Sequence, residues 1–246
     1  MILRSITRHV RDQNWFAVFL DFLIVVVGVF IGIQVANWNE AQTERRILND
    51  QLSSLHAEFT ENLNRFDVYG QRLQAKIDDI QTLRSLAAGA PHDGQDDALD
   101  RMLMNVFSVA VFIADRTTLE ELKDSRKLRQ LHGIGLRQPL VEWEEAHAGL
   151  MRLHADTMNF RNREFAPFVM DHLGFGAMGE NYAATRTIIA PSPFRNDIAM
   201  LEGNRKFDNI VVLMLGPTAA CLEFLEALRR QTGIVLERLE GQGISS

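Results

Sequence analysis

The stretch from Phe22 to Asn39, FLIVVVGVFIGIQVANWN, decides how the rest of the chain is organised, because it holds eighteen residues and no charge. An α-helix needs about 20 mostly apolar residues to cross the hydrocarbon core of a bilayer. Trp15 precedes the stretch and Trp38 lies at its end, and tryptophan favours the headgroup level of a membrane. The sequence therefore predicts a transmembrane helix over residues 16–38, with Trp15 and Trp38 as interfacial anchors.

The charges before this stretch predict its orientation. The first fifteen residues hold Arg4, Arg8 and Arg11 against one acid, Asp12. Short positive flanks remain in the cytoplasm. We therefore expect a basic cytoplasmic arm over residues 1–15 and a periplasmic body, at a bacterial inner membrane. The alternatives are a buried helix of a soluble protein and a cleaved signal peptide, although the small residues of a cleavage site are missing.

Four residues of this segment share one stripe of a helix that turns 100° per residue: Asp21, Gly28, Gly32 and Asn39. Glycines four apart let two helix backbones approach each other in lipid. The stripe therefore predicts a helix–helix contact, either with a second copy or with another membrane protein. A charge is costly at the centre of a bilayer and cheap near its edge, so Asp21 also fits a simple hydrated position among the headgroups.

A long amphipathic helix is predicted next, over residues 39–88. Its apolar positions recur at steps of three and four, with a mean step of 3.5 residues, which is typical of the seam of a coiled coil or helical bundle. These positions are Leu48, Leu52, Leu55, Phe59, Leu63, Phe66, Tyr69, Leu73, Ile77, Ile80 and Leu83.

Residues 89–246 are expected to form a helical bundle that packs on the long helix, which makes the fold class all-α. Apolar spacing predicts helices near residues 96–114, 118–132, 137–173, 197–201 and 206–239, with a loop over 174–193. Thr118 and Glu121 have the spacing of a capping box at a helix start. The apolar run over 209–222 is too short for a second membrane span, so it is expected to be a buried helix.

Two segments resemble a known family. The first is DFLIVVVGVFIGIQVANWNE, in which an acid and a glycine precede a closing Q-x-x-N-W-N-E, and the second is TLEELKDSRKLRQL, over residues 118–131. Both are similar to an uncharacterised family of bacterial single-pass membrane proteins catalogued as domain of unknown function 6090. Ala36 and Arg126 depart from the family pattern, which usually has Asn and Gly there. The resemblance implies an anchor with a helical body, and it implies no activity.

A search for catalytic chemistry finds one weak constellation. Glu144 and His147 have E-x-x-H spacing on one helix face, and His154 follows one heptad later. Di-iron bundles use two such pairs together with further glutamates, and here there is one pair. The sequence holds no nucleophile elbow, phosphate-binding loop, dinucleotide fingerprint or H-E-x-x-H motif. We expect no cofactor, and we interpret Cys221 as a small buried apolar residue.

Charge and composition favour a partner in the membrane over a nucleic acid. The net charge is -6, and an acidic body repels phosphates. The expected partners are the lipid bilayer and either a second copy or another membrane protein. The leading hypothesis is a non-enzymatic interaction, scaffold or accessory subunit. The alternatives are a helical domain that senses a small ligand and a metal-binding bundle enzyme built on Glu144, His147 and His154.

Overall fold

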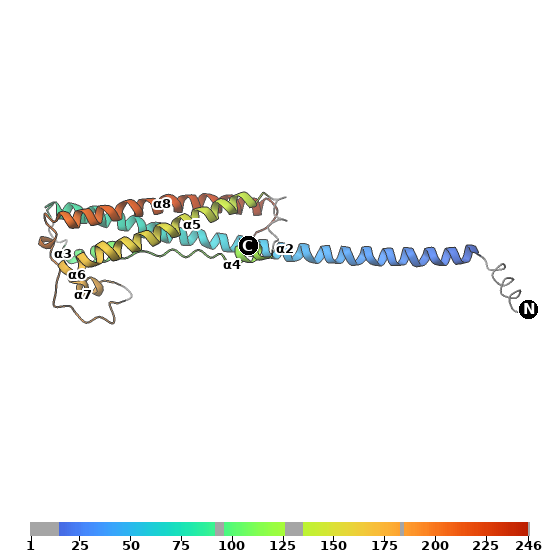
Figure 1. The fold of residues 1–246 in the computed structure, drawn as a ribbon, viewed down its shortest axis with the longest axis horizontal. Helices are drawn as coiled ribbons and strands as arrows, with labels where there is room; N and C mark the ends of the chain where they lie inside the picture. The colour runs from blue at the N-terminus through green and yellow to red at the C-terminus, as the bar shows by residue number, and fades with distance from the viewer. Residues whose placement is uncertain (1–14, 92–95, 126–134, 183–184, 246) are drawn as a thin grey trace, which may run out of the picture. The chain divides into compact units, whose positions relative to one another are not determined.

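The computed structural model describes residues 15–91, 96–125, 135–182 and 185–245, and every regular element in these ranges is a helix (Figure 1). The expected all-α fold class is therefore confirmed. The chain divides into two compact units, one ending at Leu52 and the other spanning Ser53–Ser246. Helix α2, Trp15–Ala87, contributes residues to both. The predicted basic arm falls on residues 1–14, outside the described part of the chain, and so does the side chain of Trp15.

The apolar part of the first unit, residues 16–38, has no cover from its own chain among the residues that the structure describes. Each described large apolar side chain between Phe16 and Trp38 is exposed. Among the described residues, two helices are long and apolar enough to cross a membrane, α2 and α8 (Arg205–Glu240). They differ in burial, because no residue of the apolar window of α2 is buried, whereas 33% of the window of α8 is buried inside the protein.

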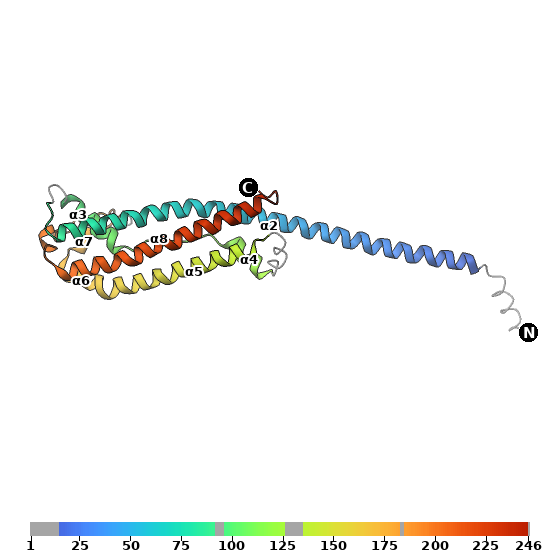
Figure 2. The same cartoon turned by 90° about the horizontal axis from the view of Figure 1, so that it is seen from above.

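The second unit is built on three long helices that lie side by side (Figures 1 and 2). They are the later part of α2, helix α5 (Arg137–Phe160) and α8. Helix α8 runs opposite to the other two (Figure 2). A π-helical turn, η2 (Arg161–Phe165), joins α5 to α6 (Ala166–His172), so the predicted helix over residues 137–173 contains one irregular turn.

The predicted seam of α2 lies in the core of this bundle. Eight of its eleven positions are buried, whereas Leu48, Leu63 and Ile77 are half-buried. The buried eight are Leu52, Leu55, Phe59, Phe66, Tyr69, Leu73, Ile80 and Leu83. The period of 3.5 residues therefore identified a real packing face, which the later helices of the chain cover.

A tryptophan and a glycine bring α5 close to its neighbours. Trp143 is fully buried beside Phe59, with ring centroids 5.3 Å apart, and its indole Nε1 donates to Thr232 Oγ1 at 2.9 Å. At Gly149 of α5 an added Cβ would lie 2.3 Å from the ring of Phe224 on α8, so this ring packs directly on the glycine and would have to move for a larger residue. The buried indole thus joins three helices while its polar nitrogen remains satisfied.

The short elements differ from the predicted ones. Helix α3 (Asp96–Phe107) ends before the expected residue 114, and α4 spans Thr117–Asp124, while residues 126–134 lie outside the described ranges. Helix α7 (Phe175–Glu180) occupies part of the expected loop over 174–193. The expected short helix near residue 198 is a 3-10 turn, η3 (Ile198–Met200).

Residues 108–114, which were predicted as the end of a helix, lie instead in an extended segment, Ser108–Arg116, which we call the strap. Its apolar residues alternate, so that Phe112 is buried between Phe66 and Tyr69 while Val111 and Ile113 are 64% and 72% exposed. A period of two residues with β-branched side chains favours extended backbone over helix. The strap runs back along α2 from α3 to α4 (Figures 1 and 2).

Polar side chains of α2 satisfy the backbone of the strap. Lys76 Nζ donates to the carbonyl of Ser108 at 2.7 Å, and an Arg65 guanidinium nitrogen donates to that of Ile113 at 3.3 Å. Asn62 is fully buried, and its amide both donates to the Asp115 carbonyl at 2.8 Å and accepts from the Asp115 N–H at 2.9 Å. An extended segment in an all-α protein has no strand partner, so these side chains take that role.

Replacement of Asn62 with alanine is expected to destabilise the second unit by about 2 kcal/mol, because it leaves a donor and an acceptor of Asp115 without partners. The measurement is urea unfolding of the detergent-solubilised protein in a Trp15→Phe, Trp38→Phe background, followed by the fluorescence of the remaining Trp143. The matched control is Asn64→Ala, since the Asn64 amide donates to the exposed side chain of Glu61, three residues away on the same helix. Equal losses of unfolding free energy in the two variants would contradict this role of Asn62.

Candidate functional site

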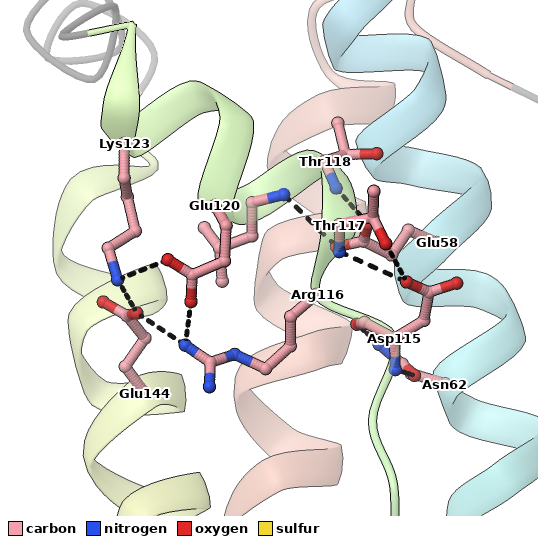
Figure 3. Close-up of polar contacts among 10 residues, drawn as sticks. Glu58, Asn62, Asp115, Arg116, Thr117, Thr118, Glu120, Lys123 and Glu144 are labelled. Atoms are coloured by element: carbon pink, nitrogen blue, oxygen red, sulfur yellow. Dashed lines mark hydrogen bonds and ion pairs between the residues drawn. The ribbon is translucent and has the colours of Figure 1, made fainter.

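The N-terminus of α4 is held by a carboxylate from another helix. Glu58 of α2 is buried and accepts from the backbone N–H groups of Thr118 at 2.5 Å and Leu119 at 3.4 Å (Figure 3). Burial raises the pKa of Glu58, and the hydrogen bonds from Thr118 oppose that increase. A carboxylate is favourable at this position because it satisfies unpaired amide groups at the positive end of a helix.

The predicted capping box of Thr118 and Glu121 is wrong. Helix α4 begins at Thr117, and its N-cap residue, Arg116, makes no side-chain cap. Asp115 accepts from both the N–H and the hydroxyl of Thr117, which lowers the pKa of the Asp115 carboxyl. The capping groups therefore come from the strap and from α2, and the distant partner, Glu58, cannot be identified from local spacing.

Glu144, the first of the three predicted metal-ligand candidates, lies in an ionic cluster that extends along α4, from Arg116 at its N-cap to Lys123 in its last turn. Its Oε1 atom accepts from Lys123 Nζ at 2.5 Å and from Arg116 Nη2 at 3.3 Å (Figure 3). Glu120 also pairs with Arg116 and with Lys123. The hydrogen bond to Glu144 raises the pKa of Lys123. The carboxylate of Glu144 thus links α5 to α4 through two cations.

His147 and His154 have other partners. The His147 ring stacks on Trp143 with centroids 5.4 Å apart and planes 3° from parallel. His154 Nε2 is hydrogen-bonded to the hydroxyl of Tyr69 on α2. Burial lowers the pKa of both imidazoles. Within the described ranges, no three side chains of His, Cys, Asp or Glu lie close enough to hold a metal ion, so the structure does not assemble Glu144, His147 and His154 into one set.

A group of four polar side chains does converge in the interior of the bundle. Tyr69 and Lys76 come from α2, His154 comes from α5, and Cys221 comes from α8. The Tyr69 hydroxyl contacts both His154 and the Cys221 thiol. Burial raises the pKa values of Tyr69 and Cys221, so both remain protonated at neutral pH. Tyr69, His154 and Cys221 thus join the three long helices through polar contacts.

Lys76 is the cation of the group, and its pKa is strongly lowered. It is buried, with a side chain that donates to the Ser108 carbonyl of the strap. Burial lowers the pKa of Lys76 to about 8, and the nearby Arg161 adds to that effect. A lysine with such a pKa exchanges its proton near neutral pH, as catalytic lysines do. Here its observed contact is with backbone, which supports a role in holding the strap.

The residues of the predicted stripe on α2 make no contact with another described helix of the chain. Asp21, Gly28, Gly32 and Asn39 are exposed. A Cβ added at Gly28 or Gly32 would meet nothing within 4 Å. The carbonyl of Asn39 accepts from Thr43 Oγ1 at 2.9 Å, a contact within one turn of the same helix. A larger residue at Gly28 or Gly32 is therefore compatible with the isolated chain. Any effect of such a substitution would report on contact with a partner.

Sequence reasoning missed the polar residues of α2 that contact the strap and the two short helices at its ends, α3 and α4. Glu58, Asn62, Lys76 and Asp79 are buried, and Asp79 accepts from Asn105 Nδ2 of α3 at 2.7 Å. A signal was present, because these positions are spaced four, fourteen (two heptads) and three residues apart along the helix, beside the apolar seam. A second face with this spacing indicates a second neighbour, although it does not say which segment provides it.

Comparison with known proteins gives no assignment. The chain matches no family model, and no curated protein and no solved structure is significantly similar to it.

Stability is expected to rise between pH 7 and pH 9 through Lys76. The unfolded lysine keeps its proton up to its ordinary pKa of 10.5, whereas the folded one releases it near 8. The unfolded state therefore binds more protons in this window, and the wild type gains about 1 kcal/mol relative to Lys76→Met. The measurement is urea unfolding of both proteins at the two pH values.

The matched control for this titration is Lys206→Met, which removes an exposed lysine of α8. It is expected to keep the pH profile of the wild type. Parallel profiles of the wild type and Lys76→Met would refute the assigned shift.

Proposed function

We propose that this chain is a single-pass protein of a bacterial inner membrane that acts as a non-enzymatic interaction or accessory subunit. The observation that carries the proposal is the apolar segment of α2, in which no described residue of the membrane-length window is buried by the chain itself. An uncovered apolar surface of this size requires lipid or another protein around it. The resemblance to the family catalogued as domain of unknown function 6090 supports the same proposal.

Helix α8 is assigned to the bundle in this proposal, although its length and composition also suit a membrane span. Its buried residues recur every three or four positions on one face, from Phe207 to Leu239. The facing positions of α5 cover that face, with Gly149 against Phe224 and Trp143 against Thr232. One amphipathic face is typical of a helix in a soluble bundle. A single span then leaves the body on one side of the membrane.

The proposed orientation has the N-terminus in the cytoplasm and the body in the periplasm, based on Arg4, Arg8 and Arg11. The stripe of Asp21, Gly28, Gly32 and Asn39 is the surface that we propose for association in the membrane.

Labelling of single cysteines is expected to establish the orientation. In a Cys221→Ala background, a membrane-impermeant maleimide applied to spheroplasts should label Gln242→Cys, which is an exposed position, and should spare Ser5→Cys until the cells are lysed. Extraction with carbonate should leave the protein in the membrane fraction. The reverse labelling pattern, or release by carbonate, would reject the proposed topology.

Enlarging the stripe is expected to abolish a specific association. Cross-linking in native membranes, followed by purification and mass spectrometry, should recover a stoichiometric partner, either a foreign protein or a second copy. Gly28→Leu with Gly32→Leu should reduce that yield at least fivefold, because leucine keeps the two backbones apart while the isolated helix accommodates it.

The matched control is Val26→Leu with Phe30→Leu, which has the same spacing on the opposite side of α2 and retains an apolar surface. It should preserve the cross-linked yield. An undiminished complex in the glycine variant would exclude the stripe as the contact, and recovery of no partner from wild-type membranes would oppose the proposed role itself.

A further inference from the structure

A small apolar cavity opens beside the π-helical turn of the second unit. Its volume is about 260 Å³, and it lies where the end of α3, the start of the strap, η2 and α7 meet. Phe107 and Phe175 contribute aromatic walls, with ring centroids 5.3 Å apart, and Met104, Val109 and Ile189 complete the apolar lining. Drug-sized pockets span roughly 300–1,000 Å³, so this cavity suits a smaller molecule.

Arg161, the first residue of the π-helical turn, contributes a positive charge to this apolar lining. Its guanidinium carbon lies 5.2 Å from the centroid of Phe107. The guanidinium donates to the side-chain oxygen of Asn162, which is a neutral amide. Among the residues that the structure describes, no carboxylate forms an ion pair with Arg161. π-Helical turns occur frequently at functional sites because they interrupt the regular order of side chains along a helix.

A second cation lies next to the first. Lys76 is hydrogen-bonded to the carbonyl of Ser108, and Ser108 lines the cavity. The positive charge of Arg161 acts on Lys76 and disfavours its charged form. No ion pair of Lys76 with a carboxylate is present in the described ranges either. Two neighbouring cations without a fixed counter-ion create a local excess of positive charge beside an apolar wall.

We propose that this cavity binds a small carboxylic acid with an apolar, ring-bearing body. The ring would pack among Phe107, Phe175 and Ile189, and the carboxylate would pair with Arg161. Guanidinium groups bind carboxylates through charge-assisted hydrogen bonds, and such bonds are stronger when the site excludes water. The proposal is independent of the association in the membrane, and it would make the bundle responsive to a metabolite.

The test uses the full-length protein in lipid nanodiscs and isothermal titration calorimetry with 4-phenylbutyrate. Its neutral counterpart, 4-phenylbutan-1-ol, has the same ring and chain without the charge, and empty nanodiscs correct for partition into lipid. The wild type should bind one equivalent of the acid at least tenfold more tightly than the alcohol. Absence of binding by the acid, or equal binding of the two, would overturn the proposal.

Variants then locate the binding. Arg161→Gln should weaken binding of the acid at least tenfold and leave that of the alcohol unchanged, whereas Arg163→Gln, an exposed arginine of the same turn, should have no effect. Val109→Phe fills the cavity and should abolish binding of both while Arg161 is retained. Circular dichroism and the Tm of each variant verify folding. Wild-type affinity in Arg161→Gln or in folded Val109→Phe would show that the acid binds elsewhere.

Discussion

Along α2, between Glu58 and Asp79, a row of polar side chains binds a part of the chain that has no regular structure of its own. The strap would otherwise bring unpaired backbone groups into the edge of a helical core, where each would cost free energy. Asn62 pairs with both backbone groups of Asp115, Lys76 satisfies Ser108, and Glu58 satisfies the first turn of α4. These contacts hold the strap on α2 and fix where α4 begins.

The strap determines how the three long helices are directed. Helices α2 and α5 run the same way, so the chain must return along the length of α2 before α5 can begin (Figure 2). From Glu58 to Lys76 the helix rises about 27 Å, at about 1.5 Å per residue. Nine extended residues reach about 30 Å. Extended backbone therefore spans this distance with half the number of residues that a helix would need. Its backbone groups then require hydrogen bonds from the polar side chains of α2.

Sequence reasoning predicted the helices whose signal is local and repeated. The 3.5-residue seam of α2, the extent of α5 with α6, and the bounds of α8 follow from apolar periodicity. The strap was predicted as helix because its period of two covers only a few residues and follows a helical segment directly. The cap by Glu58 and the contact between Tyr69 and His154 join residues 60 and 85 positions apart, so no local pattern specifies them.

The order in which this chain is synthesised has a consequence for its folding. The apolar face of α2 is complete once Leu83 has been made, but α8, which covers much of it, begins at Arg205. At about 5–20 residues per second, the ribosome needs roughly 6–24 seconds to make the intervening segment. The hydrogen-bond partner of His56, Glu240, is synthesised later still, because it lies 184 residues further along the chain, at the end of α8. During that interval the part of the seam that α8 covers remains exposed in the nascent chain, and exposed apolar surface of this kind favours aggregation with other chains.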